Sequence, residues 1–324
     1  MTATATLREI VRAARARLAA AGIDANEAAM DAGLLARHVL GWDLARLLAH
    51  EVEPPPDNFL PAFEPLVARR ADREPISSLI GRRDFWGLEF EVGPDVLAPR
   101  PETELIVEQA LAALKQAPAT LKGRPTRASS AGRGFSLADT PGNPEGSPCT
   151  RTATPLFIDV GTGSGCLAVS LAREFPCARI VATDVSAAAL AIAARNARRL
   201  GVIERVGFVR TSLLDGVAGS AALIVSNPPY IPAADIDGLA PEVRDWEPRQ
   251  ALDGGPDGLD VIRALLAAVP AVLAPGGWFI MEFGFGQEKA VEDLVRRSPL
   301  ELARIVNDLQ RIPRTLVARK AVGR

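Results

Sequence analysis

The chain has few of the side chains that bind metals or form catalytic triads. Its 324 residues include three cysteines and two histidines. Cys149, Cys166 and Cys177 lack the spacing of metal ligands, and His38 and His50 both lie in the first quarter of the chain. We therefore expect no metal site and no histidine-based triad. A small, odd number of cysteines is typical of a protein of the reducing cytoplasm.

Long apolar runs and a strong charge of either sign are also missing. The longest uncharged apolar stretch, residues 264–281, contains Pro270, Pro275 and two glycines, which a membrane-spanning helix would tolerate poorly. The N-terminal segment lacks the continuous apolar region of a secretory signal. A net charge of −2 and a pI near 5.9 give no global basic field. We expect a cytoplasmic protein with no membrane segment and no direct nucleic-acid partner.

The first part of the chain has helical periodicity and carries little chemistry. Apolar residues recur at helical spacing from Leu7 to Leu18, and Asp24 with Glu27 predicts a capping box for a second helix. Two further helices are expected at residues 43–50 and 57–70. We interpret residues 1–74 as a small helical bundle for packing or partner docking. Aromatic and β-branched residues punctuated by glycines then predict a β-hairpin linker over residues 75–98.

Residues 99–324 show the alternation of strands and helices of an α/β domain. A helix is expected to begin at Pro101 and to end near Gln116. Residues 122–155 are rich in Gly, Pro, Ser and Thr and predict a disordered insertion. Strands are predicted at residues 156–160, 179–183, 206–209, 223–226, 278–282, 301–307 and 316–319, and helices at residues 165–174, 187–200, 259–272 and 287–297. The pattern predicts a doubly wound, mostly parallel sheet with an antiparallel C-terminal strand.

A glycine-rich loop follows the first of these strands. It reads Asp159-Val160-Gly161-Thr162-Gly163-Ser164-Gly165, and its glycines let the backbone turn sharply and let a ligand approach closely. The spacing differs from the G-x-G-x-x-G of dinucleotide sites, and an acid at position 159 suits a ligand with an amino group rather than phosphates. Asp184, which ends the next strand, can accept hydrogen bonds from ribose hydroxyls. The combination predicts S-adenosyl-L-methionine; the loop alone favours a nucleoside ligand over a tight structural turn.

The stretch Asn227-Pro228-Pro229-Tyr230 ends a buried strand with polar and aromatic chemistry. Prolines lack the N–H that a sheet ladder needs, so the strand ends there and Asn227 is expected at the carboxyl edge of the sheet. The Asn227 side-chain oxygen and the Pro228 carbonyl form a pair of acceptors for a planar NH2 group. Tyr230 offers a flat face for stacking.

Several stretches together resemble the PrmC/HemK family of class I methyltransferases. They are residues 73–76 (Arg-Glu-Pro-Ile) with Gly81, residues 85–88 (Phe-Trp-Gly-Leu), residues 99–104 (Pro-Arg-Pro-Glu-Thr-Glu), residues 225–231 (Val-Ser-Asn-Pro-Pro-Tyr-Ile), residues 247–248 (Glu-Pro) and residues 251–252 (Ala-Leu). The resemblance implies methylation of the glutamine N5 in the Gly-Gly-Gln motif of class 1 peptide chain release factors, with S-adenosyl-L-methionine as cofactor. It further implies that the N-terminal bundle docks the release factor.

The resemblance also implies roles for individual residues. The cofactor would be bound by Asp159, Gly161, Thr162, Gly163, Ser164, Gly165, Asp184, Ser212, Leu213 and Asn227. The substrate would be held by Asn227, Pro228, Pro229 and Tyr230, with Asn227, Pro228 and Tyr230 as catalytic residues. At Ser212 and Leu213 the sequence departs from the family, which usually has an acid near the adenine.

Three questions stay open at this point. Arg100, Glu102 and Thr103 either reach a ligand or, as helix-start residues, complement the helix dipole. A nucleic-acid adenine or cytosine N-methyltransferase would need the same NH2-binding chemistry, together with a basic surface and base flipping. A non-catalytic cofactor-binding scaffold is the third reading of the chain.

Overall fold

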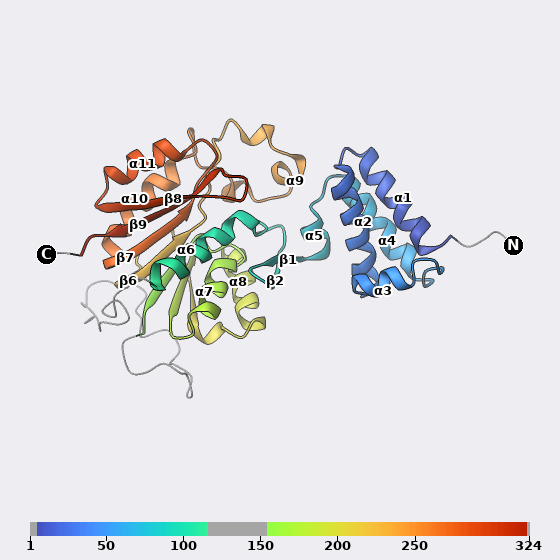
Figure 1. Cartoon of the computed structure of the whole chain (residues 1–324), viewed down its shortest axis with the longest axis horizontal. Helices are drawn as coiled ribbons and strands as arrows, with labels where there is room; N and C mark the ends of the chain where they lie inside the picture. Colours follow the sequence, from blue (N-terminus) through green and yellow to red (C-terminus); the bar gives the residue numbers. More distant parts are fainter. Residues whose placement is uncertain (1–4, 116–153, 323–324) are drawn as a thin grey trace. The chain divides into compact units, whose positions relative to one another are not determined.

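The computed structural model describes residues 5–115 and 154–322 (Figure 1). Two compact units contain them: Met1–Arg82 with Leu239–Trp246, and Arg83–Gly238 with Glu247–Arg324. The insertion predicted at residues 122–155 lies outside the described residues, except for its last two. Leu239–Trp246 groups with the N-terminal helices, although the sequence analysis assigned it to residues 99–324. Among the described helices, none combines the length and the apolar character that crossing a bilayer requires.

Helices form the N-terminal part of the first unit, as the apolar periodicity predicts. The core contains Leu18, Leu35 and the stacked rings of Phe59 and Phe63, whose centroids are 4.7 Å apart. The helices of this unit are α1 (Leu7–Ala20), α2 (Ala25–Leu40), α3 (Leu44–Ala49), α4 (Phe59–Ala71), α5 (Ile76–Ile80) and, in the returning segment, α9 (Pro241–Arg244).

The helix caps differ in one respect from the prediction. Asp24 caps α2 by accepting from the N–H groups of Asn26 and Glu27. The reciprocal capping box, however, is at α1, where the side chains of Thr6 and Glu9 each bond to the other's backbone N–H. The Glu27 carboxylate instead accepts a hydrogen bond from Arg70 Nη2 at 2.9 Å.

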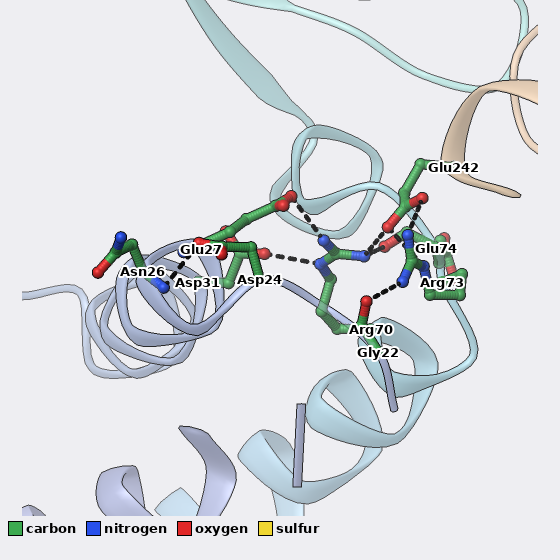
Figure 2. Close-up of polar contacts among 9 residues, drawn as sticks. All are labelled: Gly22, Asp24, Asn26, Glu27, Asp31, Arg70, Arg73, Glu74 and Glu242. Atoms are coloured by element: carbon green, nitrogen blue, oxygen red, sulfur yellow. Dashed lines mark hydrogen bonds and ion pairs between the residues drawn. The ribbon is translucent and has the colours of Figure 1, made fainter. Parts of the chain in front are cut away.

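Arg70 is the centre of a buried charge cluster in the first unit (Figure 2). Its side chain is 1% exposed and donates to Asp31 Oδ2 at 2.7 Å, to Glu242 Oε1 at 3.0 Å and to the Glu74 carbonyl at 3.4 Å, in addition to Glu27. Glu242 belongs to the segment Leu239–Trp246. Arg70 therefore holds that returning segment against α2 and α4.

A two-stranded hairpin begins the second unit. Its strands are β1 (Arg82–Phe85) and β2 (Leu88–Glu91), joined by Trp86 and Gly87, which both have positive φ (53° and 65°) as a type I′ turn requires. The predicted hairpin is thus confirmed over residues 82–91, but the prediction is wrong for residues 76–80, which form α5. The predicted helix from Pro101 begins as a 3-10 turn (Pro101–Thr103) before α6 (Glu104–Lys115).

A seven-stranded sheet of order β5-β4-β3-β6-β7-β9-β8 forms the core of the second unit. All pairings are parallel except those of β9, which runs antiparallel to both β7 and β8. The predicted doubly wound sheet with a reversed C-terminal strand is confirmed. Its strands are β3 (Leu156–Val160), β4 (Arg179–Asp184), β5 (Val206–Arg210), β6 (Ala221–Ser226), β7 (Leu273–Glu282), β8 (Leu300–Asn307) and β9 (Pro313–Lys320).

Helices cover both faces of this sheet (Figure 1). One apolar core joins the sheet to α6, α7 (Cys166–Glu174) and α8 (Ala187–Arg199), and the other joins it to α10 (Asp260–Val272) and α11 (Glu288–Arg296). The strand order reverses between β3 and β6, where Val160 pairs with Ser226. Because ligands of open α/β sheets bind beyond the carboxyl ends of the strands at such a reversal, the site is expected there.

Candidate active site

A cavity of about 790 Å³ lies at the carboxyl ends of β3, β4 and β6. Its walls contain most of the residues that the sequence analysis selected. They are Arg100, Thr103, Gly161, Thr162, Gly163, Ser164, Asp184, Ser212, Leu213, Asn227, Pro228 and Pro229. Asp159, Glu102, Gly165 and Tyr230 are not among the lining residues.

The glycine loop is held open by hydrogen bonds to the end of β4. The Thr183 carbonyl accepts from the N–H groups of Gly161 and Thr162, both at 2.9 Å. Asp184 accepts from Gly163 N at 3.0 Å with one oxygen and from Ser186 N at 2.9 Å with the other. The side chain predicted to bind ribose hydroxyls therefore also shapes the loop, and it remains on the cavity wall.

Gly165 is required by its surroundings as well as by its backbone. Its φ is 81°, a conformation that favours glycine, and a Cβ there would lie 2.9 Å from the Cβ of Ala193. Close packing of the loop on α8 therefore depends on the missing side chain. Asn196, one turn further along α8, donates to the Ser164 carbonyl and to the Glu91 carbonyl, both at 2.9 Å. It joins the glycine loop to the hairpin.

Asp159 lies beneath the glycine loop, not on the cavity wall. Its Oδ2 accepts from Thr162 Oγ1 at 2.6 Å and from Ala168 N at 3.0 Å, so it ties the loop to the first turn of α7. Complete burial raises the pKa of Asp159 from an ordinary 3.8 to about 7, against the lowering effect of these two donors. The sequence analysis expected this carboxylate to face an amino group. The structure gives it a place in the architecture of the loop.

Asn227 is held at the cavity wall by a chain of hydrogen bonds. Its Nδ2 donates to Thr103 Oγ1 at 2.9 Å, and Thr103 Oγ1 donates to Glu282 Oε2 at 2.7 Å. The other oxygen of Glu282 accepts from the Tyr230 hydroxyl at 3.0 Å. One N–H of the Asn227 amide is engaged by Thr103, and the Oδ1 of the same amide is left as an acceptor for a ligand.

The Glu282 carboxylate is 2% exposed at the end of β7. Burial raises its pKa, and the negative charge of Glu102 adds to that effect, whereas the hydroxyls of Thr103 and Tyr230 and the positive charge of Arg314 oppose it. Burial beside this carboxylate also raises the pKa of the Tyr230 phenol, so Tyr230 stays a neutral donor. The Tyr230 side chain packs against the core that includes α10 and α11.

Arg100 forms an ion pair at the cavity with a residue far away in the sequence. Its Nη2 lies 2.5 Å from Glu247 Oε2, and both residues belong to stretches that carry the family resemblance. Burial raises the pKa of Glu247, whereas Arg100 lowers it. The sequence left open whether this loop reaches a ligand or only complements the helix dipole. The structure places Thr103 at the cavity as a partner of Asn227, and Arg100 at the cavity as a partner of Glu247.

Ser212 and Leu213 line the cavity at the position where the family usually has an acid. Leu213 has a positive φ of 49°, which is uncommon for a residue with a side chain, and its carbonyl accepts from Thr183 Oγ1 at 2.9 Å. The hydrogen bond fixes this loop to the end of β4. Backbone groups and the Ser212 hydroxyl are therefore what this wall presents.

Sequence reasoning missed three residues that support the site: Glu282, Asn196 and Gln287. Gln287 accepts from Gly284 N at 2.8 Å and donates to the Tyr230 carbonyl at 2.9 Å, which fixes the loop after Pro229. A signal existed for Glu282, because an acid that ends a buried apolar strand is seldom there without a partner. Asn196 carried a weaker signal, as an amide among the alanines of a helix.

Comparison with known proteins shows which proteins the chain resembles. Residues 9–81 match the family model "PrmC N-terminal domain" and residues 150–240 match "Methyltransferase small domain". A release factor glutamine methyltransferase of Cereibacter sphaeroides is 41% identical over 96% of this chain and 97% of its own length. One of Geobacter sulfurreducens is 39% identical over 90% of this chain and 89% of its own. A solved methyltransferase structure from Pyrococcus furiosus, 18% identical, has a TM-score of 0.46 over 80% of this chain and 100% of that one.

The sequence relatives cover nearly the whole chain at an identity that leaves no doubt about common descent. The glycine loop, the end of β4 and the Asn-Pro-Pro-Tyr stretch also lie together around one cavity. The chain belongs to the release factor glutamine methyltransferase family.

Proposed function

We propose that this protein methylates the side-chain nitrogen N5 of the glutamine in the Gly-Gly-Gln motif of class 1 peptide chain release factors. The observation that carries this proposal is the orientation of Asn227, whose Nδ2 is engaged by Thr103 and whose Oδ1 is left to accept from a ligand. Pro228 lines the same cavity, and its carbonyl would be the second acceptor. A primary amide has two N–H donors, and two acceptors match them. The names of the sequence relatives state the same kind of substrate.

The cavity fits S-adenosyl-L-methionine as the methyl donor. Its volume of about 790 Å³ falls within the roughly 300–1,000 Å³ of small-molecule sites and leaves room for a side-chain amide beside the cofactor. Gly161 and Gly163 bring backbone to the wall without a Cβ, Asp184 can accept a further hydrogen bond at each oxygen, and Ser212 with Leu213 would flank the base. Among the described residues that line the cavity, Arg100 is the single basic one, so they form no cluster of Lys or Arg such as a pyrophosphate would attract.

Positioning is the main catalytic contribution that these residues can make. The nitrogen lone pair of an amide is delocalised into its carbonyl, so the amide must be oriented before it can react. Acceptors at Asn227 and Pro228 would hold both N–H groups and become more favourable as positive charge develops on the nitrogen. When bound, S-adenosyl-L-methionine supplies an electrophilic methyl group on its sulfonium, and the nitrogen that gains this methyl afterwards releases one proton to solvent. Tyr230 would support the site through its hydrogen bond to Glu282.

The N-terminal unit is proposed to dock the release factor. Supporting this, several of its apolar side chains are exposed, among them Leu44 at 54% and Leu48 at 56%. They are one turn apart on α3 and therefore share a face of that helix. Replacing both by serine is expected to raise the KM for intact release factor and to leave the KM for a short Gly-Gly-Gln peptide unchanged. An equal rise for both substrates would contradict docking by α3.

Incubation with radiolabelled cofactor tests the proposed reaction. Purified release factor and single-stranded oligonucleotides are offered separately, and the modified residue is located by mass spectrometry. We expect label in the release factor, at the glutamine of Gly-Gly-Gln. Label in the oligonucleotides would indicate a nucleic-acid methyltransferase, and label in neither would favour a scaffold. The few cysteines suit a cytoplasmic location, where such a substrate would be met.

The variant Asn227→Ala tests the residue that carries the proposal. A hydrogen bond to a group that becomes charged contributes about 1.5–3 kcal/mol, so kcat is expected to fall roughly 10- to 150-fold. The dissociation constant of the cofactor should change little, because the glycine loop and Asp184 are untouched. Equal losses in turnover and cofactor affinity would argue against a substrate-holding role for Asn227.

A further inference from the structure

The hydrogen bonds that join Glu282, Thr103 and Asn227 have a defined direction. An ionised carboxylate can only accept, so the Thr103 hydroxyl must donate its one proton to Glu282 Oε2, at 2.7 Å. The Thr103 oxygen is then an acceptor for Asn227, at 2.9 Å, and only the amide nitrogen of Asn227 can donate. The carboxylate thus determines which of the two nearly isosteric ends of the Asn227 amide faces the cavity.

We propose that Thr103 and Glu282 are positioning residues that hold Asn227 with its carbonyl oxygen toward the substrate amide. This inference rests on the proposed function. If the Asn227 amide were rotated by 180°, its NH2 would face the NH2 of the substrate, and two donors cannot bond to each other. The orientation of Asn227 is therefore as necessary as its presence.

The fold brings the three residues together from separate segments. Asn227 follows β6 and Glu282 ends β7, and these neighbouring strands pair in parallel with Ser226 opposite Met281. Asn227 and Glu282 are the residues that follow this pair, so the register places them opposite each other. Thr103, 2% exposed, comes from the turn that precedes α6 and lies between them in the hydrogen-bond chain.

The burial of the Glu282 carboxylate indicates a role other than stabilising the fold. A buried ionised group is costly to desolvate, and an apolar residue of similar volume at that position is often more stabilising. Glu282 uses both of its oxygens, one for Thr103 and one for the Tyr230 hydroxyl. Both hydroxyls lead back to the Asn-Pro-Pro-Tyr stretch, either directly through Tyr230 or through Asn227. The carboxylate is thus placed to organise that stretch.

The test compares Thr103→Val, which removes the hydroxyl at nearly constant volume, with Thr103→Ser, which keeps it. Thr315→Val is the matched control, because Thr315 is equally buried, pairs with Glu282 across β7 and β9, and has a hydroxyl without a hydrogen-bond partner among the described residues. For each variant, kcat and KM are measured with intact release factor, and the dissociation constant of S-adenosyl-L-methionine by calorimetry.

For Thr103→Val we expect kcat to fall by about tenfold, equal to about 1.4 kcal/mol in activation free energy, with the cofactor dissociation constant unchanged. Thr103→Ser should recover most of the lost turnover, and Thr315→Val should behave as the wild type. Wild-type turnover in Thr103→Val, or equal losses in the valine and serine variants, would overturn the inference. So would an equal loss in Thr315→Val. Failure of the wild type to label release factor would instead reject the proposed function.

Discussion

Replacing Arg70 by methionine should destabilise the N-terminal unit far more than the same replacement at Arg17 of that unit. Arg70 is 1% exposed, and its removal would leave Asp31, 3% exposed, as a buried carboxylate without its cation. Breaking a buried pair by removing one partner costs about 3–5 kcal/mol. Arg17 of α1 is 49% exposed and its partner Glu64 is 55% exposed, and such exposed pairs contribute about 0–1 kcal/mol.

The loss of unfolding free energy in Arg70→Met should depend on pH, and the titration of Asp31 determines the direction of that dependence. Burial raises the pKa of Asp31, and Arg70 opposes that rise. Without Arg70 the pKa of Asp31 would rise further, and protonation would relieve the uncompensated charge. The destabilisation by Arg70→Met is therefore largest at pH values above the raised pKa of Asp31 and decreases as the pH falls through it.

Hydrogen exchange in increasing urea, read by mass spectrometry, measures the unfolding free energy of each unit separately. Peptides of α2 and α4 should lose about 3–5 kcal/mol of protection in Arg70→Met and at most about 1 kcal/mol in Arg17→Met. Peptides of β3 and β6 should be unchanged in both. Adding Asp31→Leu to Arg70→Met should restore part of the loss, because the pair is then replaced by apolar side chains. Equal effects of the two methionine variants would refute the reasoning.

Three other predictions concern the second unit. Gly165→Ala should raise the dissociation constant of the cofactor, measured by calorimetry, roughly tenfold. The new Cβ would lie 2.9 Å from the Cβ of Ala193, and a φ of 81° is unfavourable for alanine. An unchanged dissociation constant would contradict this packing. Asp159 has a pKa near 7 in place of 3.8 and therefore binds a proton more tightly in the folded state. The free energy of unfolding should fall by up to about 4 kcal/mol as the pH rises between these two values. In urea unfolding, Asp159→Asn should show a weaker pH dependence. Burial raises the pKa of Glu282, so kcat should fall as the pH is lowered through it, and Thr103→Val should show a weaker dependence.

The strands were predictable because buried parallel strands are short apolar runs that end at turn residues. The run at 156–160 coincides with β3, and that at 179–183 is one residue shorter than β4. For β7 the prediction began at Trp278, whereas the strand begins at Leu273. The intervening Ala-Pro-Gly-Gly is typical of a turn, and the pairing of β6 with β7 does shift register there. Local composition could not indicate that pairing continues on both sides of this irregularity.

The charge cluster around Arg70 could not be predicted from local pattern. An arginine near the end of an amphipathic helix is ordinarily a solvated residue that complements the dipole, and nothing in α4 distinguishes Arg70 from Arg69. The difference is the face of the helix on which each lies. The carboxylate partners of Arg70 are 39, 43 and 172 residues away, whereas that of Arg69 is 5 residues away. Glu27 shows the same limit, because local spacing assigned it to a capping box.

The site shows which kind of inference a sequence supports. Asn227 was predictable because its neighbours determine its place: an apolar run places it at a strand end, and two prolines stop the strand there. Its orientation was not, because an amide has two ends of almost equal shape and the choice between them depends on Thr103, 124 residues away. For Asp159 the sequence did not determine the surroundings of the side chain. Its position before the glycine loop allows the carboxylate to face a ligand or to lie beneath the loop. The hydrogen bonds to Thr162 and Ala168 place Oδ2 beneath the loop, and no local pattern could have indicated these partners.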